Sequence, residues 1–156
     1  MKQFITVLIA SVAAMSAHAD PHNVYGVWMP PAETSHIEIS DCGDGTPCGT
    51  VVWLDAEALP EGVTPETAAD ANGDNVLGLQ MLHSFKRKEN DWRSGTIYDP
   101  EHGKTYGSRI KLKEDGTLQV KGCIGPFCQT QVWTKVAATE AGGQALMDTS
   151  LGGTDE

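Results

Sequence analysis

The residues with the clearest potential for chemistry are a group of polar side chains around one turn, Asp99–Gly103. Tyr98 and Asp99 lie at the start of this turn, and Lys104 and Tyr106 follow it. Proline and glycine within the turn favour a chain reversal that would bring Asp99 and Lys104 close together. Two interpretations are open. Asp99 caps the turn and pairs with Lys104 at the surface, or the turn forms the rim of a ligand mouth to which both tyrosines contribute amphipathic contacts.

The four tryptophans are the second candidate group. Large aromatic side chains are typical of protein cores, and they also line cavities that hold apolar ligands. We therefore treat Trp28, Trp53, Trp92 and Trp133, together with Tyr98, Asp99, Lys104 and Tyr106, as candidate ligand-binding residues. Lys135 follows Trp133 by two positions and could place its ammonium group over Trp28 at the closed end of a barrel.

No residue pattern typical of catalysis is present. Ser84 and Ser94 lie in strand contexts rather than at the sharp turn that exposes a nucleophilic serine. Glu38 and Asp99 are candidates for a carboxylate pair by residue type alone. We therefore predict no catalytic residues, and the interpretation favours a protein that is not an enzyme.

No pattern typical of a metal or cofactor site is present either. The histidines form neither an HxH nor an HExxH pair, which argues against zinc. The series Asp70-x-Asn72-x-Asp74 resembles the start of a calcium loop, but Met81 occupies the position where such a loop needs a bidentate glutamate. We predict no metal and no cofactor. The segment from Asp70 to Asp74 is expected to form a polar loop.

The N-terminal segment, residues 1–19, has the features of a secretory signal peptide. Lys2 supplies the positive charge, an apolar stretch follows, and Ala17-His18-Ala19 forms an A-x-A cleavage site. The apolar stretch is short for a membrane span. We therefore expect cleavage after Ala19 and export of the remaining chain to the periplasm. No other segment is apolar enough to span a membrane.

The net charge of −10 argues against nucleic acid as a partner, because such a chain repels phosphate backbones. No stripe of lysine and arginine along the sequence offsets this charge. The cluster Lys86-Arg87-Lys88 is followed at once by Glu89 and Asp91, which indicates a solvated strand end.

Four cysteines in an exported chain predict two disulfides, for which three connectivities exist. The pairs Cys42–Cys48 and Cys123–Cys128 are favoured because each pair brackets a short segment rich in glycine or proline. Bridges of this length contribute about 2 kcal/mol each on the chain-entropy model. Their main effect is to fix the shape of the loops.

Alternation of apolar and polar residues predicts an all-β fold. In residues 104–113 and 117–121 every second side chain is suited to the buried face of a sheet, and the side chains between them are suited to the solvent face. A half-buried strand requires this alternation. Similar stretches along residues 20–136 give about eight strands with short connections, enough to close one small antiparallel barrel. A half-open sandwich is the alternative.

The Asp55–Leu77 insertion lacks the alternation typical of strands. Thr64-Pro65-Glu66 predicts the start of one short helix there, ending near Gly73. Residues 137–156 show no periodicity and are expected to form a disordered acidic tail.

These features resemble a family of secreted bacterial proteins known only as domain of unknown function 2147. The resemblance spans nearly all of the mature chain that follows Ala19. It is carried by Trp28, Ile37-Glu38-Ile39, Cys42, Cys48-Gly49, Val52-Trp53-Leu54, Gly78, Gly95, Ile97-Tyr98-Asp99-Pro100, Gly103-Lys104-Thr105-Tyr106, Leu118 to Gly122 and Gln131-Val132-Trp133-Thr134. Lysine at position 135, where arginine is usual, and the Cys123/Cys128 pair depart from the family pattern. The resemblance implies a small β-rich periplasmic domain and no established activity.

Gly26-x-Trp28 near the start also resembles the opening of lipocalins and related calycin barrels, in which the tryptophan plugs the closed end. This resemblance implies a module that holds a small apolar or amphipathic ligand. The alternative is an envelope interaction or stress protein with a solid barrel and a surface site for a partner.

Overall fold

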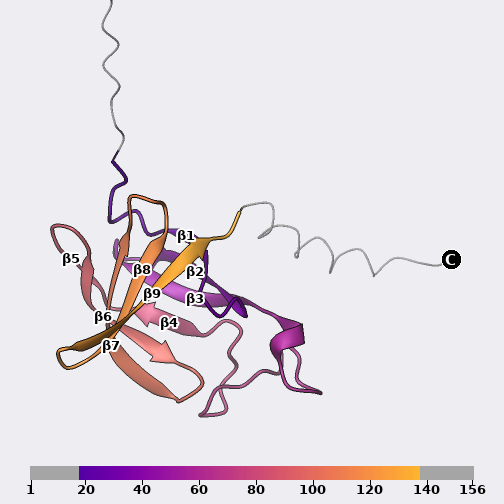
Figure 1. The fold of residues 1–156 in the computed structure, drawn as a ribbon. Helices are drawn as coiled ribbons and strands as arrows, with labels where there is room; N and C mark the ends of the chain where they lie inside the picture. The colour runs from indigo at the N-terminus through magenta and orange to yellow at the C-terminus, as the bar shows by residue number, and fades with distance from the viewer. Residues whose placement is uncertain (1–17, 138–156) are drawn as a thin grey trace, which may run out of the picture.

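A computed structural model describes residues 18–137 and shows an all-β barrel (Figure 1). Alternating side chains and short turns produce one nine-stranded sheet within these residues. Its strands are β1 (Gly26–Met29), β2 (Ser35–Asp41), β3 (Pro47–Leu54), β4 (Gln80–His83), β5 (Lys86–Arg87), β6 (Trp92–Asp99), β7 (Lys104–Leu112), β8 (Leu118–Ile124) and β9 (Phe127–Lys135).

The sheet closes on itself. Strands follow the order β4-β3-β2-β1-β9-β8-β7-β6-β5, and an additional pairing of β4 with β6 completes a barrel of eight strands with β5 outside it. All pairings are antiparallel, and neighbours in the barrel are mostly neighbours in the chain. The predicted antiparallel barrel of about eight strands is therefore confirmed, and the half-open sandwich is not formed.

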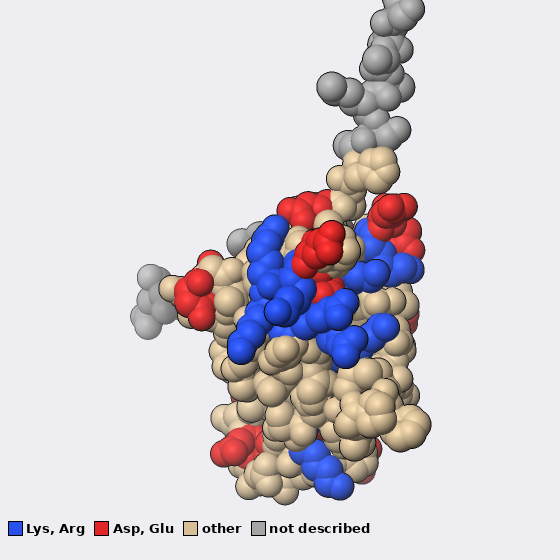
Figure 2. Space-filling model, turned by 90° about the vertical axis from the view of Figure 1, so that its left-hand side faces the viewer, with Lys and Arg blue, Asp and Glu red and all other residues tan. Residues whose placement is uncertain are grey.

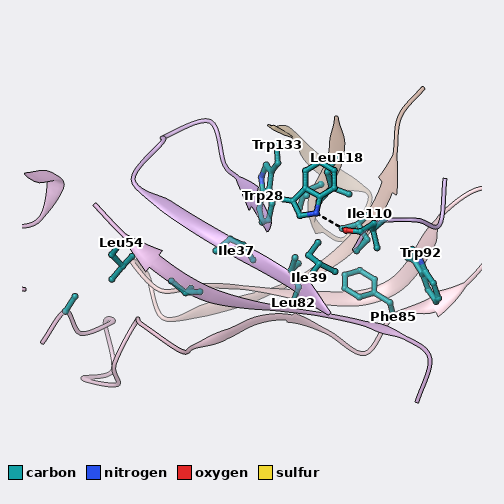
Figure 3. Close-up of a cluster of buried hydrophobic side chains, with 14 residues drawn as sticks. Trp28, Ile37, Ile39, Leu54, Leu82, Phe85, Trp92, Ile110, Leu118 and Trp133 are labelled. Carbon is teal, nitrogen blue, oxygen red and sulfur yellow. Dashed lines mark hydrogen bonds between the residues drawn. The ribbon is translucent and has the colours of Figure 1, made fainter. Parts of the chain in front are cut away.

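The interior holds the apolar side chains that the two-residue alternation predicted. Ile110 of β7 and Leu118 and Val120 of β8 are buried, whereas Arg109 between two inward positions is exposed. Figure 3 shows part of this cluster, in which side chains from β1, β2, β4, β6, β7, β8 and β9 meet. Burial of this apolar surface is the main favourable contribution to folding.

One end of the barrel is plugged by Trp28. Its side chain is fully buried, and its indole N–H donates a hydrogen bond of 2.8 Å to the carbonyl oxygen of Val24 (Figure 3). The ammonium group of Lys135 lies 5.1 Å from the ring centroid, as predicted. Gly26 permits this arrangement, because its φ of +123° is unfavourable for other residues and a Cβ there would lie 3.0 Å from Cε of Lys135.

The insertion between β3 and β4, residues 55–79, differs from the prediction. The short helix expected between Thr64 and Gly73 is reduced to one hydrogen-bonded turn at Thr64, and a three-residue 3-10 helix forms instead at Ala56–Ala58. The side chain of Asp70 accepts hydrogen bonds from the backbone N–H groups of Asn72 and Asp74, which favours a loop over a helix.

The four cysteines form the two predicted disulfides, Cys42–Cys48 and Cys123–Cys128. Nearly all of the expected signal peptide (1–19) and of the expected acidic tail (137–156) lies outside the described residues, so both stay predictions. None of the helices found between residues 18 and 137 is long and apolar enough to cross a membrane.

Candidate functional site

A cavity of about 790 Å³ opens at the end of the barrel opposite Trp28. It lies between the β6–β7 turn, the β8–β9 hairpin and the start of β2. Its lining comprises Pro30, Ser35, Met81, Ile97, Tyr98, Asp99, Pro100, Glu101, His102, Tyr106, Val120, Gly122, Ile124, Phe127, Cys128, Gln129, Gln131 and Trp133. Its size is in the range of cavities that hold small ligands.

The deep part of the cavity is apolar. Buried Val120 and Trp133 belong to the barrel core, and half-buried Met81 and Ile97 line the cavity beside them. The indole N–H of Trp133 donates a hydrogen bond of 2.8 Å to Oε1 of Gln131, so this donor is satisfied within the wall. An apolar molecule that entered this space would therefore displace no hydrogen bond of the indole.

The rim carries the polar groups. The carboxylate of Asp99 accepts hydrogen bonds from the backbone N–H groups of Glu101, at 3.0 Å, and His102, at 3.3 Å. Nδ1 of His102 lies 2.8 Å from the same carboxylate. Asp99 thus caps the turn, as the first interpretation predicted. Its side chain contacts His102 rather than Lys104, which lies opposite it in the strand register.

The β8–β9 hairpin extends the apolar wall beyond the barrel. Ile124 and Phe127 are cross-strand partners that line the cavity, yet 68% and 81% of their surfaces are exposed. The Cys123–Cys128 disulfide lies directly behind them and fixes the hairpin. No charged residue occurs between Lys121 and Lys135. Sequence reasoning identified the disulfide but missed these two apolar side chains.

The cavity also opens sideways, between β9 and β1. Among the described strands, β9 pairs with β1 only through Thr134 and Lys135, because β1 ends at Met29. Pro30 and Pro31 follow, and proline cannot continue a ladder of backbone hydrogen bonds. The mouth is therefore wider than a fully paired barrel end would allow.

Hydrogen bonds of Tyr98 link the insertion, residues 55–79, to the rim of the cavity. The hydroxyl of Tyr98 donates a hydrogen bond to Oδ2 of Asp70 and accepts one of 2.8 Å from Nδ2 of Asn72. The backbone N–H of Ala71 donates to the carbonyl oxygen of Pro100 at 2.9 Å. The hydrogen bond to Asp70 raises the pKa of Tyr98, and it lowers the pKa of Asp70. The Asp70 series therefore serves as a polar loop that fixes the rim.

Tyr98→Phe is expected to release the insertion and to remove a pH dependence. The lowered pKa of Asp70 means that its contribution is complete above the ordinary carboxyl value and is lost as the pH falls through the folded-state pKa. The raised pKa of Tyr98 means that its contribution is complete below 10.0 and is lost as the pH rises through the folded-state value. Limited proteolysis of residues 55–79 should be slowest between these limits in the wild type. The variant should be cleaved faster within that pH range, and the two proteins should become alike outside it. Equal cleavage of both proteins at neutral pH would contradict this assignment.

Of the eight predicted site residues, Tyr98, Asp99, Tyr106 and Trp133 line the cavity. Trp28 plugs the closed end, and Trp92 is buried, donating its N–H to the carbonyl oxygen of His22 at 3.0 Å. Trp53 packs against His36 at 4.3 Å, and Lys104 begins β7 at the rim. Binding of a ligand by the eight stays a prediction.

The sequence reasoning missed several residues that line the cavity, among them Met81, Ile97, Ile124, Phe127, Gln129 and Gln131. Two-residue alternation puts Gln129 and Gln131 on the same face of β9 as Trp133, and this is the one signal in the sequence that points to them.

A closed eight-stranded barrel, plugged at one end and open to a cavity at the other, defines the lipocalin-like class of architecture. The chain belongs to the family described as uncharacterized proteins conserved in bacteria (DUF2147), whose model matches residues 26–135. Among solved structures it is similar to protein HP1028 from the human pathogen Helicobacter pylori, which is described as a member of the lipocalin family. The TM-score is 0.59 and the identity 16%, over 83% of this chain and 90% of that chain, so this likeness shows the fold alone. No curated protein matches the chain.

Proposed function

We propose that this protein is a non-enzymatic binding protein for a small apolar or amphipathic ligand, exported to the periplasm. The observation that carries the proposal is the cavity of about 790 Å³, apolar in its depth and polar at its rim. Such a distribution suits a molecule whose apolar part enters the barrel and whose polar end stays at the surface.

Under this proposal, each part of the site has a role. Ile97, Met81 and Trp133 would contact the apolar part of the ligand, and Ile124 and Phe127 would extend that contact beyond the barrel end. Gln129, Tyr106 and the Asp99–His102 pair supply hydrogen-bonding groups near the polar end. The signal peptide that the sequence predicts at residues 1–19 supports a periplasmic location.

Gly122→Leu should abolish most ligand binding. Gly122 lines the cavity, and a Cβ there would lie 3.5 Å from Cγ2 of Ile97, an ordinary contact, so a leucine side chain would enter the cavity without a clash at its base. We expect at least about tenfold weaker binding of a long-chain fatty acid, or of another amphiphile from a lipid panel. The measurement is the change in tryptophan fluorescence on titration, because Trp133 lies in the cavity wall.

The matched control is Gly107→Leu on the adjacent strand β7. Gly107 is exposed and lies outside the cavity lining, and a Cβ there would meet only the carbonyl oxygen of Cys123, at 3.6 Å. The control should bind as the wild type does. If native mass spectrometry finds no co-purified ligand and no amphiphile changes the fluorescence of the wild type, the binding proposal fails. The alternative of an envelope protein with a surface partner would then be favoured.

A further inference from the structure

The outer wall of β5 to β8 carries a transverse row of cations, one from each strand: Lys86, Arg93, Arg109 and Lys121. Lys86 and Arg93 are cross-strand partners, and so are Arg109 and Lys121. Figure 2 shows lysine and arginine gathered on this side of the molecule, with a few acidic side chains beside and among them. No local sequence pattern predicts this cationic row, because its members lie far apart in the chain and only strand pairing brings them together.

The cationic row lowers the stability of the fold. Like charges directly opposite each other on neighbouring strands are destabilising, and the row contains two such pairs. The chain has 21 acidic residues. Yet between residues 18 and 137 only Arg93 of the row forms an ion pair within 4 Å, with Asp91 at 2.6 Å. Three of the four aligned cations therefore have no ion pair among the described residues, and such a surface is suited to an anionic partner.

A small hollow lies in the middle of the cationic row. A space of about 210 Å³ is lined by Arg93 and Arg109, together with Ser94, Gly95, Gly107, Ser108 and Cys123. A β-bulge between Trp92 and Gly95 produces it, with Ser94 at a φ of +56°. Arg93 and Arg109 both border this open space, and a guanidinium group is well suited to the oxygens of a phosphate group.

We propose that the cationic row is a docking surface for the phosphate groups of an anionic phospholipid bilayer. Each cation near such a surface strengthens binding about fivefold, so that the three members of the row other than Arg93 together give an enrichment of about a hundredfold. A bilayer meets only this wall of the barrel and leaves the acidic remainder facing solvent. A nucleic acid fits less well, because the other outward residues of β7 and β8 near the row, Gly107, Lys111, Gln119 and Cys123, include no aromatic side chain on which a base could stack.

The test compares two variants of equal net charge by flotation with vesicles. Arg109→Gln with Lys121→Gln removes two charges from the cationic row. Ser40→Glu with Val52→Glu changes the net charge by the same amount on β2 and β3, across the barrel. Both Ser40 and Val52 are exposed. The first variant should fold at least as well as the wild type, because it removes a like-charge pair, and circular dichroism checks this.

Wild-type protein should float with phosphatidylcholine vesicles that contain about one third phosphatidylglycerol, and not with phosphatidylcholine alone. Binding should weaken strongly when NaCl is raised from about 0.15 M to about 0.5 M. The row variant should show about thirtyfold lower partitioning, and the control variant a much smaller change. Equal loss in both variants, or no preference of the wild type for anionic vesicles, overturns the proposal. Absent vesicle binding together with row-dependent binding of a single-stranded oligonucleotide would identify a soluble polyanion instead.

Discussion

Replacement of Trp28 by alanine is expected to lower the free energy of unfolding by about 3–5 kcal/mol. The side chain is fully buried at the closed end, so its truncation leaves a large cavity in the core. The loss also leaves the buried carbonyl oxygen of Val24 without its 2.8 Å hydrogen bond and removes the ring beneath the ammonium group of Lys135. The measurement is urea denaturation followed by circular dichroism.

Two further variants keep this prediction testable if the alanine variant does not fold. Trp28→Phe retains most of the apolar volume and should lose less stability than Trp28→Ala, chiefly through the unpaired carbonyl oxygen. Trp53→Ala removes a half-buried tryptophan of β3 that packs against His36, and its cost should be clearly smaller. Equal losses for Trp28→Ala and Trp53→Ala would show that Trp28 is not the plug of the barrel.

The barrel and its closed end were predictable because local patterns determine them. Strict alternation along residues 104–113 determines which face of β7 is buried, and a shift by one residue would bury Arg109 instead of Ile110. The short spacing of Cys123 and Cys128 limits the bridge to one hairpin. The separation of two between Trp133 and Lys135 puts both on the same face of their strand, and cross-strand pairing of Lys135 with Trp28 then produces the predicted cation–π contact.

The mouth was predictable only in part, because its geometry depends on distant segments. Tyr98 was identified as amphipathic, but its hydrogen bond to Asp70, 28 residues away, depends on where the insertion returns to the barrel. The helix expected at Thr64 was wrong because a side chain further along the loop supplies competing hydrogen bonds. The exposure of Phe127 arises because β1 ends early and leaves β9 without a partner on that side. None of these three features can be inferred from a local sequence pattern, because each depends on a contact between distant segments.

Gly95→Ala is expected to lower the free energy of unfolding by about 3 kcal/mol, the upper range for overpacking a core. A Cβ at this position would lie 2.3 Å from Cδ1 of Phe85, far inside van der Waals contact. Phe85 is itself buried among Ile39, Trp92 and Ile110 and cannot move aside freely (Figure 3). Gly107→Ala on the adjacent strand is the matched control. Its Cβ meets only the carbonyl oxygen of Cys123 at 3.6 Å, and the change should stay within about 0.5 kcal/mol.

A double-mutant cycle separates this steric cause from the general effect of adding a side chain to a strand. Phe85→Ala alone should cost about 3–5 kcal/mol, because it leaves a cavity over Gly95. In that background the added methyl group of Gly95→Ala enters the cavity, so its cost should fall to near zero or become a gain. The expected coupling is about 1–3 kcal/mol. Additive losses would mean that Phe85 is not the group that excludes a side chain from position 95, and that the glycine is required by the neighbouring bulge instead.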